Sequence, residues 1–330
     1  MNPVITAWTA VSPYGIDRDS FVDGLRGGHA AAVSDGAVHQ AALVPGFDAR
    51  ELLGRKGTRS MDRLIGLAVW AVGHLTADRP AARGDRSGLV LGTMGSLQST
   101  MDFSRSSFTE AKPYFVDAAR MPNSIMNSAA GQCAIWHSLT GPNVTLAGGR
   151  PAGLSALACA LRLLRAGRAS NVLVGAVEEY SDTRSWIESH SAVDAVDAVG
   201  VAESAGVLGE GCVMLRVEPA GDHPALAEVL AVRSRVALPG DIEGTLASCV
   251  DDALAGAGVA ADDVAIEFWS GVPGRADPVA DLIGDTGAAT AMFQVAGVLA
   301  TGEPGDVAVV GSADRDGAVV CAVLRLGGPR

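Results

Sequence analysis

Two segments of the chain repeat the same order of residue types, and this repeat constrains the fold more than any other sequence feature. Residues 152–176 (AGLSALACALRLLRAGRASNVLVGA) align without a gap with residues 287–311 (GAATAMFQVAGVLATGEPGDVAVVG). Each copy has a small-residue start, an apolar stretch with helical spacing, a glycine-containing turn and an apolar run typical of a buried strand. A similar strand follows each copy, at 214–217 and 323–326. The repeat predicts two halves of like topology, and chance similarity of two unrelated units is the alternative.

Short apolar runs alternate with helical stretches along the whole chain. This alternation is typical of an α/β fold, here with mostly parallel sheets. We expect a first half at residues 1–220 and a shortened second half at residues 221–330, packed together as one globular unit. The predicted strands lie at residues 4–10, 88–92, 143–147, 172–175, 212–217, 226–236, 264–269, 307–311 and 318–326, and the predicted helices at 61–75, 152–165, 242–255 and 286–299.

The charge and the cysteines of the chain exclude several classes of function. The net charge is −12, and nucleic acid binding requires clustered Lys and Arg, so no nucleic acid partner is expected. No apolar run approaches the roughly 18 residues of a membrane span, and the N-terminus lacks a signal-peptide pattern. Neither a metal nor a cofactor is expected. The cysteines are Cys133, Cys159, Cys212, Cys249 and Cys321, and no two of them form a CxxC pair. This scattered arrangement favours free thiols in a protein of the cytoplasm.

Five short motifs follow one another along the chain. They are VITAWTAVSPYG at residues 4–15, GLVLGT at 88–93, MPNSIMNSAAG at 121–131, LTGP at 139–142 and GEG at 209–211. In this order and spacing they resemble the β-ketoacyl synthases of the thiolase superfamily, over nearly the whole chain. The resemblance implies a thiolase-like fold, in which two similar halves give a layered α/β/α/β/α architecture. The chain is shorter than a typical family member, mainly in its second half.

The resemblance also locates the position of the catalytic cysteine. In the family a Gly-Pro turn leads into a strand that ends at a nucleophilic cysteine, at the N-terminus of a buried helix. That placement lowers the pKa of a thiol, and the helix amides can hold an oxyanion. Here the count from Gly141 and Pro142 reaches Arg150, followed by Pro151 at the predicted helix start. Arginine stays protonated and cannot carry an acyl group.

Both catalytic histidines of the family are missing as well. In the family they lie in the second half, where they assist decarboxylation of the extender unit and stabilise the developing oxyanion. Here the last histidine is His223, and the only lysines are Lys56 and Lys112. Ser270 and Asp285 lie near the two lost histidine positions. The resemblance therefore implies a chain without the residues that catalyse condensation.

The interpretation of Arg150 stays open. Its side chain fills the pocket that an acyl chain occupies in an active subunit, or crosses a dimer interface to a carboxylate, or lies partly exposed at a helix start. Asp285 is interpreted as a helix N-cap rather than as a catalytic residue.

One basic cluster stands out in an otherwise acidic chain. Arg55, Lys56, Arg59 and Arg63 follow Arg50 within one short segment. In related synthases, basic residues near this helix lie toward the docking face for the acyl carrier protein, which is acidic. These residues are candidates for carrier protein docking, and a solvated helix start is the alternative.

Residues 101–115 are rich in aromatic side chains, although aromatics are only 5% of the chain. We expect this segment to be a loop. In chain length factor subunits the corresponding region lines or closes the distal end of a polyketide tunnel at the dimer interface, and a small surface core is the alternative. Family dimers also pair the strand before the nucleophile across a two-fold axis. The tunnel and interface candidates are therefore Met101, Phe103, Phe108, Tyr114, Phe115, Asn143, Val144, Thr145, Leu146 and Arg150.

The lost catalytic residues make the chain resemble a chain length factor (KS-β) of type II polyketide synthases. Such a subunit does not condense. It pairs as a heterodimer with an active ketosynthase (KS-α), works beside an acyl carrier protein and shapes the cavity in which the chain grows. Arg150 differs from the glutamine common in aromatic polyketide factors, so a factor for reduced polyene or aryl polyene chains is an alternative within this class.

Two other functions stay open. One is a stand-alone decarboxylase or acyltransferase of the thiolase fold that uses non-standard residues, although no base or nucleophile is found. The other is a silent homodimer that binds carrier protein as a scaffold. Activity of the isolated protein would favour the first, and a stable homodimer indifferent to any ketosynthase would favour the second.

Overall fold

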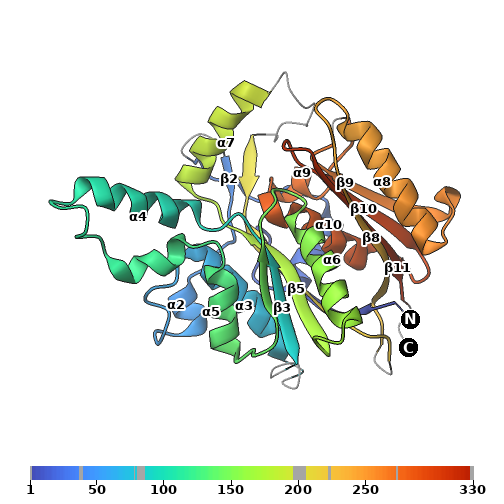
Figure 1. Ribbon diagram of the computed structural model, residues 1–330, viewed down its shortest axis with the longest axis horizontal. Coiled ribbons are helices and arrows are strands. Elements are labelled where there is room, and N and C mark those ends of the chain that lie inside the picture. Colours follow the sequence, from blue (N-terminus) through green and yellow to red (C-terminus); the bar gives the residue numbers. More distant parts are fainter. Residues whose placement is uncertain are drawn as a thin grey trace.

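The computed structural model describes residues 2–36, 40–77, 79, 86–195, 206–221, 224–272 and 274–327. Its helices and strands form five layers, in which two parts of one sheet enclose a central helical layer and carry further helices on their outer faces (Figure 1). This is the layered α/β/α/β/α architecture that the sequence predicts. No helix among the described residues is long and apolar enough to cross a membrane.

Most strands lie close to the predicted ranges, whereas β2 and β6 were not predicted, and the strand directions differ from the prediction. They are β1 (Val4–Val11), β2 (Gln40–Ala42), β3 (Ser87–Gly92), β4 (Asn143–Leu146), β5 (Asn171–Glu178), β6 (Val207–Gly209), β7 (Gly211–Glu218), β8 (Ala227–Val236), β9 (Val264–Ser270), β10 (Val307–Ala313) and β11 (Ala318–Leu326). Nine of them form one sheet in the order β4-β3-β5-β7-β1-β8-β11-β10-β9, and β2 pairs with β6.

The nine-stranded sheet is mixed. Strand β3 runs parallel to β4 and β5, and β9 runs parallel to β10, whereas every other neighbouring pair in this sheet is antiparallel. The prediction of mostly parallel sheets is therefore wrong. Apolar runs identify buried strands, but they do not give strand direction, and the strands β7, β1, β8 and β11 at the middle of the sheet alternate in direction.

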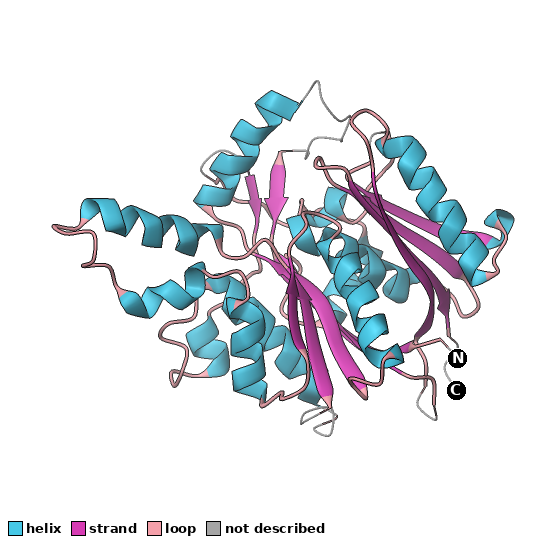
Figure 2. Cartoon of the chain, viewed as in Figure 1, coloured by secondary structure: helices cyan, strands magenta, loops and turns pink. Residues whose placement is uncertain are grey.

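The helices separate into a central layer and two outer layers (Figure 2). Helices α1, α6 and α10 contribute to the central core, α3 and α5 cover the outer face of the first half of the sheet, and α8 covers the outer face of the second half. The helices are α1 (Arg18–Gly27), α2 (Ala49–Leu53), α3 (Arg63–Ala77), α4 (Leu97–Thr109), η2 (Ala118–Ser124), α5 (Ser128–His137), α6 (Ala152–Arg165), α7 (Asp182–Ala195), α8 (Ile242–Ala257), η3 (Ala261–Asp263), α9 (Ala280–Ile283), η4 (Gly287–Ala289) and α10 (Thr290–Thr301).

The repeated unit of the sequence is present in both halves as α6 followed by β5 and as α10 followed by β10. In α6 the side chains of Leu154, Leu157, Leu161 and Leu164 recur at helical spacing and are buried. Helix α10 is buried on nearly all sides, because it lies between the two parts of the sheet. Strand β7 follows the first unit and β11 follows the second.

The second half lacks a described counterpart of β4, so β9 is the outermost strand at its end of the sheet. The expectation that the chain is shortened in the second half stays a prediction. The division into residues 1–220 and 221–330 stays a prediction. Strand β1 pairs with strands on both sides of that division, β7 and β8.

Helix α4 and helix η2 form an arm that projects from the side of the molecule (Figure 1). The expectation that residues 101–115 form a loop is wrong, because the segment is helical up to Thr109. None of the side chains of α4 is buried. Large apolar residues are few in this helix, where they are Leu97, Met101, Phe103 and Phe108, and the helix was missed for that reason.

Candidate functional site

Arg150 lies in the turn that leads from β4 into α6. The preceding Gly149 has φ +60°, and a Cβ atom there would lie 1.7 Å from Oδ2 of Asp314, so the turn requires glycine. The backbone N–H of Arg150 donates to the same carboxylate oxygen at 2.7 Å. An amide at this helix start is the kind of group that can stabilise an oxyanion, and here it is already bonded to Asp314.

The guanidinium of Arg150 lies 2.5 Å from Oδ2 of Asp285, and the two side chains are 15% and 6% exposed. Burial alone would raise the pKa of Asp285, but the charges of Arg150 and Arg184 outweigh it and lower this pKa to about 2. Asp285 also accepts a hydrogen bond from the backbone N–H of Gly287 at 2.8 Å, as a capping side chain does. The carboxylate that Arg150 contacts belongs to the same chain.

Ser270 ends strand β9 beside this ion pair. Its Oγ donates to Oγ of Ser312 at 2.8 Å, and both side chains are fully buried. A Cβ atom on the next residue, Gly271, would lie 2.9 Å from Cδ of Arg150 and 2.2 Å from the carbonyl oxygen of Ala313. Glycine therefore leaves room for the Arg150 side chain. The structure brings Arg150, Ser270 and Asp285 to one place, while the roles assigned to them stay predictions.

A cavity of about 380 Å³ is lined by the Arg150–Asp285 pair together with residues from both halves. Burial raises the pKa of Asp277, another lining residue, to about 6. The lining contains neither a cysteine nor a histidine among the described residues. The same part of the chain holds no cluster of His, Cys, Asp and Glu that could bind a metal ion. We find no group here that could carry an acyl chain or act as an imidazole base.

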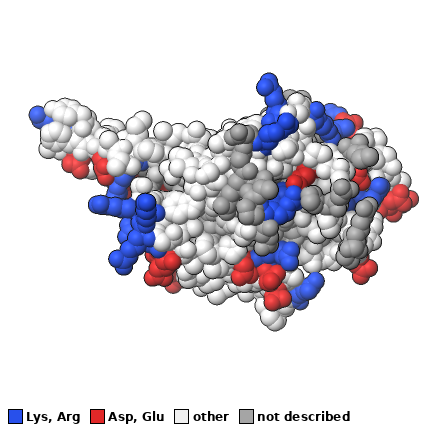
Figure 3. Space-filling model, turned by 90° about the horizontal axis from the view of Figure 1, so that it is seen from below, with Lys and Arg blue, Asp and Glu red and all other residues white. Residues whose placement is uncertain are grey.

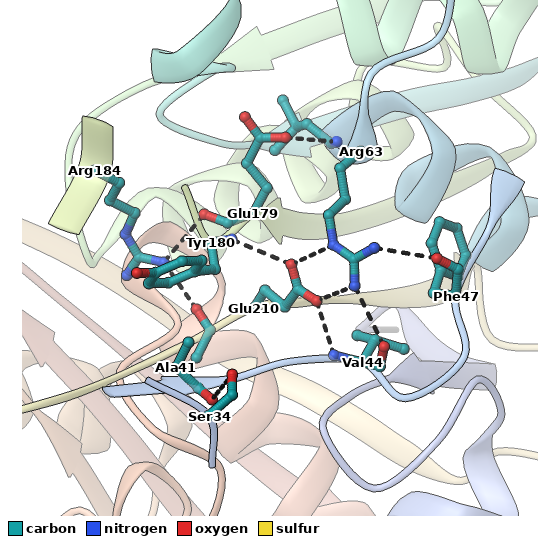
Figure 4. A network of polar contacts seen from close by, with 11 residues as sticks. Ser34, Ala41, Val44, Phe47, Arg63, Glu179, Tyr180, Arg184 and Glu210 are labelled. Atoms are coloured by element: carbon teal, nitrogen blue, oxygen red, sulfur yellow. Dashed lines mark hydrogen bonds and ion pairs between the residues drawn. The ribbon is translucent and has the colours of Figure 1, made fainter. Parts of the chain in front are cut away.

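Arg63 is part of a buried polar network at the start of α3 (Figure 4). Its guanidinium pairs with the fully buried carboxylate of Glu210 and donates to the carbonyl oxygens of Phe47 at 3.1 Å and Val44 at 3.3 Å. Glu210 also accepts from the backbone N–H of Tyr180 at 3.2 Å. These contacts fix the guanidinium of Arg63 against Glu210. The docking role of Arg63 stays a prediction.

The remaining docking candidates, Arg55, Lys56 and Arg59, are exposed, and their role stays a prediction. Figure 3 shows Lys and Arg side chains gathered at the end of the molecule that carries the projecting arm, with Asp and Glu side chains beside them. An open groove of about 760 Å³ contains Arg50 and Arg59 on this side of the molecule. The groove is mixed in charge, because its lining also includes Arg120, Asp62, Asp102 and Asp117.

The arm presents apolar side chains to solvent. Phe108 is 88% exposed, Tyr114 is 69% exposed, Phe115 is 55% exposed and Met101 is 40% exposed, whereas Phe103 is half-buried. Contiguous apolar surface of this kind marks contact with another molecule more often than it marks free surface. The tunnel and interface roles of these five residues stay predictions.

Strand β4 has a free edge, because it pairs only with β3 among the described strands. The carbonyl oxygens of Pro142 and Leu146 accept hydrogen bonds from β3 at 2.8 and 3.0 Å, so the backbone groups of the alternate residues Asn143 and Thr145 point away from it. Val144 and Leu146 are half-buried. The buried Oγ1 of Thr145 has no hydrogen-bond partner in the described part of the chain. The edge is thus open to a further strand.

Sequence reasoning missed Asp314 and the apolar residues around the arm. Asp314 lies in the turn between β10 and β11, and no motif marks it. One signal for the second group was available, since Met94, Met101, Met121 and Met126 are half of the eight methionines of the chain. The exposed apolar residues that were missed are Met94, Met121, Ile125, Met126, Ile135 and Trp186.

Residues 2–223 match the family model "Beta-ketoacyl synthase, N-terminal domain", which covers more than half of the chain. The chain belongs to the β-ketoacyl synthase family. As a ketosynthase-family protein it has the thiolase-like fold that its motifs indicated.

This ketosynthase-family chain is similar to solved structures over its full length. The ishigamide ketosynthase/chain length factor is 43% identical, with a TM-score of 0.89, and the match covers 99% of this chain and 100% of that chain. A ketosynthase bound to a hexaketide, in complex with its type II PKS acyl-carrier protein, is 19% identical with a TM-score of 0.79. That match covers 99% of each chain and shows the fold alone.

Curated ketosynthases are more distant. The 3-oxoacyl-[acyl-carrier-protein] synthase 2 of Vibrio cholerae is 26% identical over 190 residues, which are 54% of this chain and 46% of that enzyme. The chain therefore spans about half the length of the curated relatives it matches.

Proposed function

We propose that this chain is a non-condensing, chain length factor-like subunit of a type II polyketide synthase. It pairs with an active ketosynthase, forms one wall of the tunnel for the growing chain, and meets the acyl carrier protein through that complex. The reducing cytoplasm is the proposed location, because all five cysteines are free.

The observation that carries the proposal is the bonding of Arg150. At the position of the family nucleophile the backbone N–H donates to Asp314 and the guanidinium pairs with Asp285. A condensing site requires a nucleophile, a free donor for the oxyanion and a base or imidazole donor. The site offers none of the three, since its amide is occupied and its cavity lacks Cys and His among the described lining residues.

The free edge of β4 supports pairing with a second thiolase-fold chain. A strand edge with outward N–H and C=O groups gains hydrogen bonds when another strand is added to it. The backbone N–H and C=O of Thr145 point away from β3. Its hydroxyl is buried and has no hydrogen-bond partner among the described residues. A partner strand along β4 would supply hydrogen bonds to the outward backbone groups.

The choice of partner rests on the likeness to the ishigamide ketosynthase/chain length factor. That chain is matched over its whole length at 43% identity. The name of that protein couples a chain length factor with a ketosynthase. A chain that cannot condense alone acts in such a pair by shaping the shared cavity, and the exposed apolar arm is the part of this chain suited to that contact.

The test is reconstitution. The isolated chain should neither decarboxylate malonyl-carrier protein nor condense acyl units, and condensation should require an active ketosynthase in the same preparation. Replacing the catalytic cysteine of that ketosynthase by alanine should abolish product. Malonyl decarboxylation by the isolated chain that survives Arg150→Ala would overturn the proposal in favour of an enzyme with non-standard residues.

A further inference from the structure

The arm is attached to the rest of the protein by polar contacts at its root. Helix α4 has no buried side chain, so apolar packing does not fix its direction. The contacts that hold it are concentrated in its first turn, around Ser96 and Ser99. Beyond that turn the helix extends away from the body of the molecule (Figure 1).

Ser96 connects the arm to the end of β5. It is 3% exposed and is the N-cap of α4, where its Oγ accepts from the backbone N–H of Ser99 at 3.1 Å. The same hydroxyl donates to Oε1 of Glu179 at 2.6 Å. The other oxygen of Glu179 accepts from the backbone N–H of Leu64 at 2.9 Å. One carboxylate thus joins the start of α4 to the start of α3.

Ser99 makes a second connection of the same kind. Its Oγ donates to Oδ2 of Asp62 at 2.9 Å, and Oδ1 of Asp62 accepts from the backbone N–H of Ile65 at 2.9 Å. The starts of α3 and α4 are therefore bound to each other through two separate serine–carboxylate pairs. Two such pairs fix the direction of the α4 axis, whereas a single pair would leave α4 free to rotate about that one contact.

Two further contacts limit the arm on its sides. Oε1 of Gln98 accepts from Oγ1 of Thr183 in α7 at 2.8 Å. Oγ1 of Thr100 lies 3.3 Å from the carbonyl oxygen of Ser124 in η2, and it donates over a shorter distance, 2.8 Å, to the carbonyl oxygen of Ser96. The side chains of Gln98, Thr100 and Thr183 are exposed or half-buried, so water competes for them. The serine–carboxylate pairs are the more buried part of the root.

We propose that Ser96 and Ser99 are positioning residues that fix the angle of the arm and, through it, the tunnel wall that the arm contributes at the partner interface. The first part concerns this chain alone, and the second part rests on the proposed function. A helix turned about its root displaces its far end most, so small changes at Ser96 and Ser99 move Phe108 and the aromatic residues beyond it.

The first test measures the arm in the isolated protein. Nitroxide labels are attached at Thr109→Cys on the arm and Arg165→Cys at the end of α6, in a Cys159→Ser background. The other four cysteines are buried and should not react with the label. Pulsed dipolar spectroscopy should give one narrow distance distribution for this parent and a distribution at least about twice as wide for Ser96→Ala/Ser99→Ala.

Matched variants distinguish the effect of losing the root contacts from the effect of a general loss of stability. Ser99→Ala alone keeps the Ser96 cap and should still broaden the distance distribution. Ser99→Thr keeps a hydroxyl at this position and should give the narrow distribution of the parent. Ser104→Ala removes an exposed hydroxyl from the same helix and should change nothing. A double variant that folds and gives the parent distribution would overturn the proposal.

The second test uses the complex with an active ketosynthase. The double variant should form the complex and release a broader range of product lengths than the wild type. A loosened arm with unchanged product lengths would refute the link between the root and the tunnel wall. Absence of condensation by the wild-type pair would instead contradict the proposed function, and it would leave the spectroscopic result intact.

Discussion

Arg150 and Asp285 each precede one copy of the internal repeat by the same distance, and their side chains form an ion pair 2.5 Å long. Counting back two residues from the start of each copy, at residues 152 and 287, reaches Arg150 and Asp285. The pair therefore joins the start of α6 in the first half to the start of η4 in the second half. It occupies the place where the family resemblance implies a cysteine and a histidine.

The first prediction concerns the stability that this pair contributes. Asp285→Asn keeps the shape of the side chain and its acceptor for Gly287, but it leaves the buried charge of Arg150 without its partner. Loss of one partner of a buried ion pair typically costs about 3 to 5 kcal/mol. We expect a loss of this size in urea unfolding, and a smaller loss when Arg150→Met is added, because the stranded charge is then removed.

The exposed pair of Arg235 and Asp252 is the matched control, since both side chains are about half exposed. Removing Asp252 should leave the urea midpoint nearly unchanged. Additive effects of Arg150→Met and Asp285→Asn would contradict the inference that the two side chains are coupled.

The second prediction is a loss of stability as the pH rises from about 4.5 to 8. Glu178 is fully buried, and burial, opposed by the charge of Arg184, raises its pKa to about 8 from the ordinary value of 4.5. Between these values the native protein holds a proton that the unfolded chain has released, so the free energy of unfolding falls with rising pH. Glu178→Gln should flatten this dependence, measured by urea unfolding at pH 5, 6, 7 and 8.

Two other groups contribute to the same trend at lower pH and serve as an internal control. Burial and the nearby charge of Asp62 raise the pKa of Glu179 to about 7, and burial raises that of Asp277 to about 6. In Glu178→Gln the free energy of unfolding should therefore still fall between pH 5 and 6. An unchanged slope between pH 7 and 8 in that variant would contradict the prediction.

Much of this arrangement follows from the sequence, because buried periodic segments carry a strong signal. The central helix α6 and strand β5 lie where the apolar spacing of residues 152–176 predicts them, and the repeat finds their counterparts in the second half. The arm was predicted as a loop because its helix is stabilised by its cap and by polar contacts at its root, and apolar periodicity does not report either.

The site was only partly predictable. The gap-free count from Gly141 reached Arg150, and the missing histidines identified the region of Asp285, but no pattern indicated that the two side chains bond to each other. Asp314 contacts Arg150 across a separation of 164 residues. Arg63 was named as a docking candidate because its neighbours are basic. Its partner Glu210 is distant in sequence and buried, so no pattern indicated that pair.

The third prediction concerns the free edge of β4. Thr145→Pro removes a backbone N–H that points away from β3, so the ladder between β3 and β4 is retained while the outward edge is blocked. We expect the affinity for the ketosynthase to fall at least about tenfold, which corresponds to about 1.4 kcal/mol. Sedimentation or native mass measurements on the mixed subunits would detect this loss.

Thr145→Val is the control for that change, because it keeps the backbone N–H and the shape of the side chain. It should retain most of the affinity. Equal binding by wild type and Thr145→Pro would show that the partner does not use this edge.

The fourth prediction concerns the tip of the arm. Phe108 is 88% exposed, so Phe108→Ser should leave the thermal stability of the isolated chain unchanged while it weakens pairing with the ketosynthase. Val236 is 80% exposed on β8, away from the arm, and Val236→Ser is the matched control. A similar effect of both substitutions on pairing would argue against a specific role of the arm.

The fifth prediction concerns the acyl carrier protein. Reversing the charges of Arg55, Lys56 and Arg59 to Glu should raise the KM of the paired complex for carrier protein, and the difference should shrink at high salt because screening weakens contacts between exposed charges.

The control for this charge reversal carries the same change in net charge at another place. Arg162, Arg165 and Arg168 are exposed near the end of α6. Their replacement by Glu should leave the KM for carrier protein close to that of the wild type. An equal rise in both triple variants would indicate a general charge effect rather than a docking surface.

The most direct measurement is the native mass of this protein, purified alone and after co-expression with an active ketosynthase. The account predicts a one-to-one complex of the two chains, with condensation activity that neither chain has alone. A stable homodimer that ignores the ketosynthase would contradict the account, and the chain would then have to act without such a partner.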